Sequence, residues 1–319
     1  MALEITVNTQ LLQDLYYGGH HPVPKGAAAN DKENAKPKEH PPPSRKPEKW
    51  ALESPRKEIK QKMKRTLRSL QNSDSEIEAQ CAIASLCYQA SFDGDSRQDD
   101  KIERKLCRRL FRLKAIPVLL KALEKWRESL CFASQTVILL IKITYFEPNR
   151  SLTHVLEHNG IPLLLNIGTH YHQDDLNLSA DILLVLENLS RHDASRGDSS
   201  LEQSRTKSCC PLDGIMKKVL ATSDCIDFVA TKMHDYPHDD ILQRNACGYL
   251  ENIGYFAAHC SHHHKNNYKN KLHKRGIPYL LEKAIDNFWY SNTRVASQAR
   301  EALCVIDNLY HQQYGAPVE

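Results

Sequence analysis

The sequence contains few glycines and few aromatic residues, and it lacks any long apolar run. Of 319 residues only 12 are glycine, and aromatic residues make up 7%. No stretch of 18 or more apolar residues occurs, so a membrane span is not expected. The start, Met1-Ala2-Leu3-Glu4, lacks the basic and apolar regions of a signal peptide, so the 10 cysteines are expected to be reduced thiols. These absences predict a cytoplasmic or nuclear protein.

Catalytic motifs are also missing. We find no Gly-rich phosphate loop, no nucleophile elbow and no metal-dependent hydrolase motif, which predicts a non-enzymatic protein without a cofactor. The nearest approach to a metal site is the segment 259–264, where Cys260 and His264 have the spacing of zinc ligands. Adjacent histidines in a polar loop are more often exposed to solvent, so no metal site is predicted.

The positive charge is concentrated at the N-terminus. Residues 1–70 contain 14 Lys and Arg against 8 Asp and Glu, whereas the whole chain has a net charge of only +4. Residues 18–55 are rich in proline and charge, and they have too little apolar surface to offset the entropy of ordering the chain. We therefore predict that residues 1–54 form a disordered basic arm, in which the mildly amphipathic residues 1–17 are a short docking segment.

Two short words in this arm resemble regulatory signals. Lys32-Glu33-Asn34 resembles the KEN-box degradation signal, and Ser54-Pro55 resembles a cyclin-dependent kinase site. A phosphate on Ser54 would lie at the start of a helix, where the helix dipole favours negative charge. Ser54 is therefore a candidate regulatory residue.

The sequence does contain a repeated phrase. Ala-Ile-Pro-Val-Leu-Leu begins at Ala115, and Gly-Ile-Pro phrases begin at Gly160 and Gly276. A second phrase of the type Leu-Glu-Asn-Leu ends each unit, and its asparagines are Asn188, Asn252 and Asn308. This period predicts a stack of helical repeats. The predicted organisation is capping helices in 55–100, a solenoid in 101–311 with loop insertions at 191–213 and 258–270, and a flexible tail at 312–319.

The three-helix unit with Gly-Ile-Pro-x-Leu-Leu and then Asn-Leu resembles the armadillo repeat, over roughly residues 75–311. The resemblance implies an all-α fold: a right-handed α-solenoid of about four armadillo-type three-helix repeats plus an N-terminal partial repeat. It also implies a scaffold or adaptor that binds an extended peptide along a groove lined by the third helix of each repeat. The tryptophans that import receptors of this family place four residues before the Asn are absent, since Leu184, Gly248 and Cys304 stand there.

Helical spacing on the third helices separates a buried face from an outer face. The Asn falls on the outer face, where its amide could pair with both backbone groups of a bound peptide. The predicted groove residues are Asn188, Asn252, Asn308, Lys142, Asp181, Leu184, Asn245 and Glu301.

The charges of the predicted groove suggest its partner. Acidic residues at the groove or its rim, Asp181, Glu187, Glu251, Glu301 and Asp307, favour an extended basic or mixed-charge peptide. The alternative is binding of nucleic acid or an anionic surface through the basic helices 56–68 and 101–114. The oligomeric state is not predicted.

Overall fold

The computed structural model describes residues 53–90, 99–171, 175–191, 220–258 and 262–314. The chain divides into two units, Met1–Glu48 and Lys49–Glu319, and every described residue belongs to the second. Among these residues all regular structure is helical. The helices are α2 (Glu53–Asn72), α3 (Glu76–Ala90), α4 (Asp99–Arg112), α5 (Ala115–Lys125), α6 (Leu130–Phe146), α7 (Pro148–Glu157), α8 (Gly160–His170), α9 (Leu176–Ser190), α11 (Ser223–Asp235), α12 (Asp240–Ala258), α13 (His262–Lys274), α14 (Ile277–Phe288) and α15 (Thr293–Tyr314).

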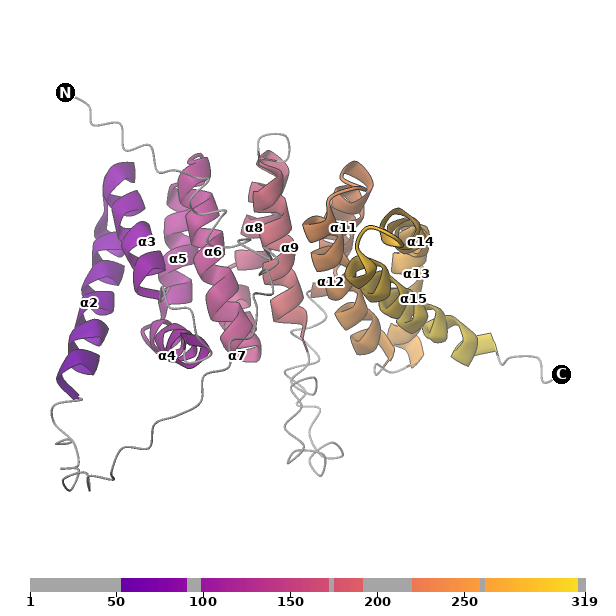
Figure 1. Cartoon of the computed structure of the whole chain (residues 1–319), viewed down its shortest axis with the longest axis horizontal. Helices are drawn as coiled ribbons and strands as arrows, with labels where there is room; N and C mark the ends of the chain where they lie inside the picture. The colour runs from indigo at the N-terminus through magenta and orange to yellow at the C-terminus, as the bar shows by residue number, and fades with distance from the viewer. Residues whose placement is uncertain (1–52, 91–98, 172–174, 192–219, 259–261, 315–319) are drawn as a thin grey trace, which may run out of the picture. The chain divides into compact units, whose positions relative to one another are not determined.

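The helices stack as successive units. The third helices α3, α6, α9, α12 and α15 each contact the next one along the chain, and Figure 1 shows them following one another. We call these five helices the third-helix row. Helices α4–α6, α7–α9 and α13–α15 form three-helix units, and α11 and α12 supply the second and third helices of another unit. The predicted all-α solenoid is therefore confirmed, whereas its right-handed sense and its number of about four repeats stay predictions.

Every helix of the third-helix row begins at a capping side chain. In each case this side chain accepts a hydrogen bond from the backbone N–H three residues further on, which is the geometry of an N-cap. The capping residues are Ser75, Ser129, Asp175, Asp239 and Asn292. Because the five caps share one geometry, counting from the cap gives a common register for the five helices.

The turns before the second helices use a left-handed residue. Lys114 and Asn159 have φ of 57° and 51°, and Gly276 has φ of 67° before α14. Gly160 itself begins α8 and has another role. A Cβ on Gly160 would lie 2.8 Å from side-chain atoms of both Leu120 and Val155, so this glycine permits close packing of helices.

The predicted apolar face of the third helices is buried. In α9, Ile182, Leu183, Leu186 and Leu189 have no exposed surface. These positions recur at helical spacing, so they lie along one side of the helix and pack against the rest of the stack.

Three predicted boundaries differ from the structure. Most of the loop predicted at 258–270 belongs to α13, where Tyr268 and Leu272 are buried. Two apolar residues among polar ones give little periodicity, so the sequence does not indicate this helix. Packing against the neighbouring helices stabilises it. Helix α2 begins at Glu53, which places Ser54 inside the first turn, and α15 continues to Tyr314 into the predicted tail.

Several predictions lie outside the described residues. These are the arm over residues 1–52 with its Lys32-Glu33-Asn34 word, the insertion over 192–213, and the Cys/His segment at 259–261. Within the described residues, no helix combines the length and apolarity that crossing a membrane requires.

Candidate functional site: the third-helix face

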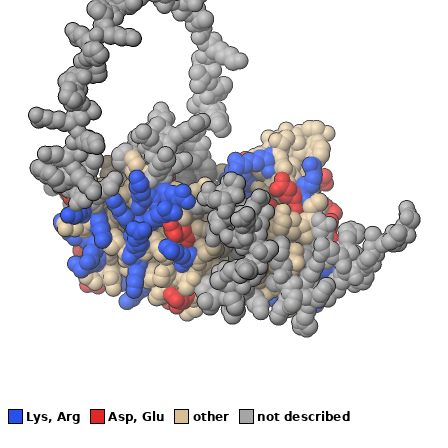
Figure 2. All heavy atoms as spheres, turned by 90° about the horizontal axis from the view of Figure 1, so that it is seen from below, with Lys and Arg blue, Asp and Glu red and all other residues tan. Residues whose placement is uncertain are grey.

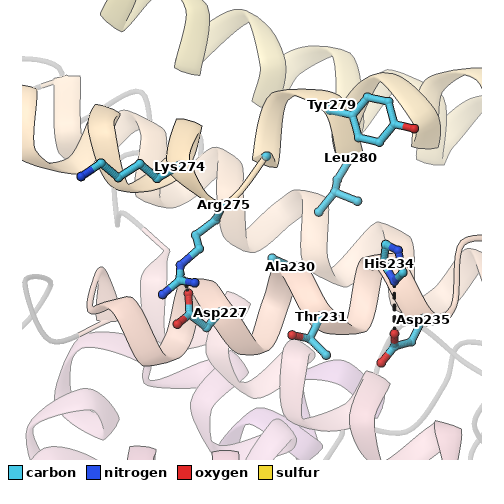
Figure 3. A pocket seen from close by; sticks show the side chains of 10 residues that line it. Asp227, Ala230, Thr231, His234, Asp235, Lys274, Arg275, Tyr279 and Leu280 are labelled. Carbon is cyan, nitrogen blue, oxygen red and sulfur yellow. Dashed lines mark hydrogen bonds and ion pairs between the residues drawn. The ribbon is translucent and has the colours of Figure 1, made fainter.

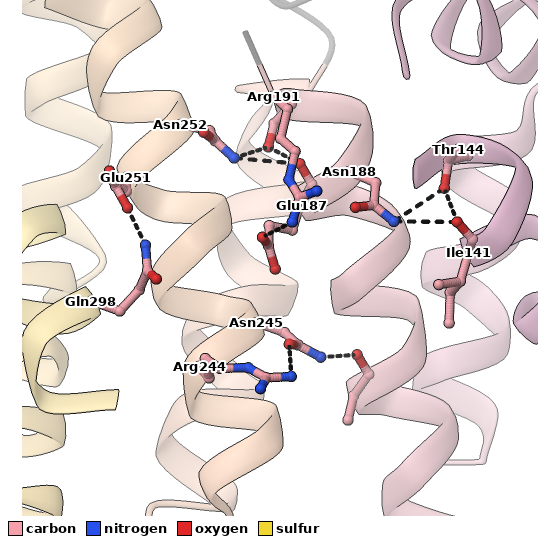
Figure 4. Close-up of polar contacts among 12 residues, drawn as sticks. Ile141, Thr144, Glu187, Asn188, Arg191, Arg244, Asn245, Glu251, Asn252 and Gln298 are labelled. Atoms are coloured by element: carbon pink, nitrogen blue, oxygen red, sulfur yellow. Dashed lines mark hydrogen bonds and ion pairs between the residues drawn. The ribbon is translucent and has the colours of Figure 1, made fainter. Parts of the chain in front are cut away.

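Asn188 is buried between two third helices. Its side chain has no exposed surface, and its Nδ2 donates to the backbone oxygen of Ile141 and to Oγ1 of Thr144, both at 3.4 Å (Figure 4). Both acceptors lie on α6, the preceding third helix. The prediction that this amide faces outward is therefore wrong for Asn188, because the neighbouring helix covers that side. A role of Asn188 in peptide binding stays a prediction.

Asn252 repeats this arrangement one unit later. Its Nδ2 donates to the backbone oxygen of Glu187 at 3.4 Å and to Oγ of Ser190 at 3.1 Å (Figure 4). Counted from the caps, both asparagines stand at position 13, and their acceptors stand at positions 12 and 15 of the preceding helix. We call this recurring contact the asparagine brace. Asn252 differs from Asn188 in being only half-buried.

Asn308 stands at a different position from the asparagines of the brace. It lies 16 residues after the cap Asn292, about one helical turn beyond the position of Asn188 and Asn252. Position 13 of α15 is Val305, and position 15 of α12 is Gly254. A Cβ on Gly254 would lie 2.9 Å from Cγ1 of Val305. An apolar contact between Val305 and Gly254 thus replaces the amide and the hydroxyl of the earlier junctions.

Position 6 of α9 and of α12 is also buried. Asn245 donates from Nδ2 to the backbone oxygen of Ala180 on α9 at 2.9 Å. The equivalent residue of α9 is Asp181, which is 9% exposed. Burial, and secondarily the charge of Asp175, raises the pKa of Asp181 from its ordinary 3.8 to about 7. Both residues were predicted for the groove, but the structure places them between helices.

The other predicted groove residues lie in three different surroundings. Lys142, at position 13 of α6, forms an ion pair between its Nζ and Oε1 of Glu103 on α4 at 2.8 Å. Leu184 is half-buried against the core, and Glu301 is exposed on α15. The side chains of Ser54 and Asn308 are outside the described part of the structure.

Position 16 supplies exposed residues that the sequence analysis missed. Tyr145 and Tyr255 are 46% and 44% exposed, and Arg191 stands at the same position in the chain between them. The Arg191 guanidinium lies 5.3 Å from the centre of the Tyr145 ring, within the range of a cation–π contact. Counting 16 residues from each capping Ser or Asp would have found all three.

Carboxylates from three successive third helices lie near one another: Glu301 is exposed, whereas Glu187 and Glu251 are half-buried. The side chain of Glu187 packs against Gly248 of α12, because a Cβ added to Gly248 would lie 2.8 Å from Cδ of Glu187. Burial raises the pKa of Glu251, and the charges of Glu301 and Glu187 raise it further, against a hydrogen bond from Gln298 that lowers it. Arg191 partly neutralises Glu187 through an NH2–Oε1 contact of 2.8 Å. We call the exposed side of the third-helix row, which carries Glu187, Glu251, Glu301, Leu184, Tyr145, Arg191 and Tyr255, the third-helix face.

A separate cavity of about 590 Å³ lies beside α11, away from this face (Figure 3). Asp227 and Arg275 form an ion pair on one side of it, and Nδ1 of His234 lies 3.3 Å from Oδ1 of Asp235. Thr231 and Tyr279 also line the cavity. The described lining thus contains two acid–base contacts, Asp227 with Arg275 and Asp235 with His234.

Basic side chains gather on one surface of the molecule (Figure 2). On α4, Arg104, Lys105, Arg108 and Arg112 are exposed, and all four lie within a sector of about 100° around the helix. Arg108 pairs with Glu147, with Nε and Oε1 2.6 Å apart. Six further exposed cations lie on α2: Lys57, Lys60, Lys62, Lys64, Arg65 and Arg68.

The stacked three-helix units and their third-helix row define a helical-repeat protein with an armadillo-like fold. No protein-family model matches the sequence, and the search of curated proteins gives no match.

Solved structures similar to this chain include engineered repeat proteins. An engineered protein of the Northeast Structural Genomics Consortium is 14% identical, with a TM-score of 0.42, over 77% of this chain and 98% of that chain. A designed armadillo repeat protein in complex with the peptide (KR)4 is 16% identical, with a TM-score of 0.40, over 76% of this chain and 99% of that chain. A second engineered protein is 15% identical, with a TM-score of 0.36, over 77% and 68% of the two chains.

Proposed function

We propose that this protein is a non-enzymatic scaffold that binds an extended basic or mixed-charge polypeptide along the third-helix face. The observation that carries the proposal is the set of three carboxylates, Glu187, Glu251 and Glu301, from three successive helices. Burial raises the pKa of Glu251, and repulsion from the charges of Glu301 and Glu187 raises it further. A Lys or Arg of a bound chain would relieve this repulsion, and so would bind with complementary charge.

The other residues predicted for the groove divide into two roles under this proposal. Leu184, Glu301 and the half-buried Asn252 would contact the bound chain. Asn188, Asn245, Lys142 and Asp181 would hold the third helices in place through their contacts with neighbouring helices. Tyr145 and Tyr255 add exposed aromatic surface, which is common among residues that dominate binding energy at interfaces.

The test uses a fluorescent peptide of four Lys-Arg pairs and a neutral Gly-Ser peptide of equal length. Fluorescence anisotropy should show binding of the basic peptide only. The double variant Glu251→Gln, Glu301→Gln should weaken its binding roughly tenfold, equivalent to about 1.4 kcal/mol. The matched control, Glu282→Gln with Asp286→Asn, changes two exposed acids of α14 and should leave the affinity unchanged. Equal affinity of the carboxylate variant and the wild type would overturn the proposal.

Binding of a nucleic-acid backbone is a second candidate function, supported by the basic surface of α4 and α2 in Figure 2. Neutralising phosphates releases counterions, so the affinity for a 20-base-pair duplex should fall steeply with salt. The variant Arg104→Glu, Lys105→Glu should reduce both the affinity and the salt slope. The control Arg294→Glu on α15 should change neither, and a duplex that binds equally to all three proteins would contradict this function.

A further inference from the structure

An exposed apolar stripe runs along α3, the first helix of the third-helix row. Its members stand at positions 2, 6, 9 and 13 after the cap Ser75: Ile77, Cys81, Ala84 and Tyr88. All four are exposed, and Ile77 and Tyr88 are 72% and 71% exposed. At 100° per residue the four positions fall within a sector of about 60°, so they form one continuous strip. We call this strip the α3 stripe.

In the later helices, positions 6 and 13 contact the preceding third helix. Asn188 and Asn252 occupy position 13, and Asn245 occupies position 6, and all three donate to backbone oxygens of that helix. On α3 these positions hold Cys81 and Tyr88, and no helix of the described chain packs on them. The α3 stripe therefore faces the open N-terminal end of the row. Its composition is suited to apolar contacts and not to a further asparagine brace.

The opposite end of the row has different chemistry. The positions of α15 that would face a following helix include 5, 12 and 15 after its cap, and they hold Ser297, Cys304 and the half-buried Asp307, with the exposed Arg300 one turn before Cys304. Arg300 lies 4.7 Å from the centre of the Trp289 ring. A second copy added head to tail would bring the charged residues Arg300 and Asp307 toward Ile77 and Tyr88, which would desolvate charges among apolar side chains. The α3 stripe is thus mismatched to the other end of its own chain.

We propose that the α3 stripe is an apolar subsite that adjoins the third-helix face at the N-terminal end of the row, and that the bound polypeptide is bipartite. One segment of it carries aliphatic or aromatic side chains for Ile77 and Tyr88, and a second, basic segment reaches Glu187, Glu251 and Glu301. This inference rests on the proposed function, because both segments belong to one chain bound along the same row. Tyr145 on α6 provides exposed aromatic surface between the two subsites.

The spacing of the two segments follows from helix packing. Neighbouring helices pack about 8–10 Å apart, and an extended chain advances about 3.3 Å per residue. Along the third-helix row, Glu187 on α9 lies two helices from α3, and Glu251 on α12 lies three helices from it. The apolar and basic segments should therefore be separated by about five to eight residues.

The experiment selects binders from a display library of random 16-residue peptides, using the full chain as bait. We compare the wild type, the stripe variant Ile77→Ser, Tyr88→Ser, and the carboxylate variant Glu251→Gln, Glu301→Gln. Both altered tyrosine and isoleucine side chains are exposed, so folding should be preserved, which circular dichroism checks. Tyr290→Ser is the matched control, because Tyr290 is 94% exposed after α14.

Support for the proposal requires that wild-type peptides carry both segments at this spacing. The stripe variant should lose the apolar segment and bind a synthetic selected peptide at least tenfold more weakly, while Tyr290→Ser binds it normally. Peptides with a basic segment alone, or unchanged affinity in the stripe variant, would overturn the bipartite site and leave the proposed function standing. If no selected peptide responds to the carboxylate variant, the proposed function fails as well.

Light scattering tests whether a second copy of the chain, and not a peptide, covers the α3 stripe. A wild-type dimer that the stripe variant converts to a monomer would identify the α3 stripe as a contact between two copies, and would overturn the inference. A wild type and a stripe variant of the same mass agree with the bipartite site.

Discussion

The junction between α6 and α9 and the junction between α12 and α15 solve the same packing problem in different ways. The first uses a buried amide, Asn188, against Thr144 and a backbone oxygen. The second uses Val305 against Gly254. The difference teaches that the cap, and not the Asn phrase, sets the register of these helices. At the last junction the residues at positions 13 and 15 are both different: Val305 replaces the Asn and Gly254 replaces the hydroxyl residue. This joint change is expected if positions 13 and 15, counted from the caps, are the ones that meet.

The largest effect is expected when the buried brace is removed. Asn188→Ala should lower the free energy of unfolding by about 1–3 kcal/mol, because it deletes two hydrogen bonds in a buried site and leaves a cavity. Urea denaturation followed by circular dichroism measures this change. The control Asn177→Ala alters an exposed amide on the same helix and should stay within about 0.5 kcal/mol of the wild type. Equal effects of the two variants would refute the brace.

An intermediate effect is expected at position 6, where α9 has a carboxyl group and α12 an amide. The folded protein keeps Asp181 protonated up to about pH 7, whereas the unfolded chain loses this proton near 3.8. The folded state binds more protons between these values, so stability should fall as pH rises from about 4 to 7 and then level off.

Asp181→Asn should abolish this part of the pH dependence and stabilise the protein at pH 8 by on the order of 1–2 kcal/mol. Denaturant melts at pH 5 and pH 8 test it. A matched change of the exposed acid, Asp286→Asn, should leave the slope as it is in the wild type. If Asp181→Asn were less stable than the wild type at pH 8, the folded protein would have to stabilise the charged form of Asp181, and the prediction would be wrong.

The smallest effect is expected at the half-buried brace. Asn252→Ala should lower the free energy of unfolding by about 0.5–1.5 kcal/mol, which is less than Asn188→Ala. Asn252 is only half-buried, so water can bind some of the acceptors that lose the amide. The same urea melts measure the difference between the two variants. A larger loss for Asn252 than for Asn188 would reverse the comparison and mean that burial does not rank the two braces.

Much of the fold could be predicted because apolar periodicity carries it. Ile182, Leu183, Leu186 and Leu189 are buried as the spacing predicted, and the predicted solenoid of three-helix units is present. Helix α13 could not be predicted, since Tyr268 and Leu272 stand among polar residues and gain their helix from packing. The candidate site was predicted less well. Leu184 and Glu301 remain on the third-helix face, whereas Asn188, Asn245 and Asp181 are buried against neighbours.

The sequence by itself determined the repeat period and the buried face of each third helix, because these depend on spacing along the chain. The tertiary structure alone decided which side of a third helix the next helix would cover. A helical wheel gives the angle of Asn188 but not the position of α6, so an amide that appeared to be outward is enclosed. It also decided that Val305 meets the preceding helix, since that depends on where Asn292 starts α15.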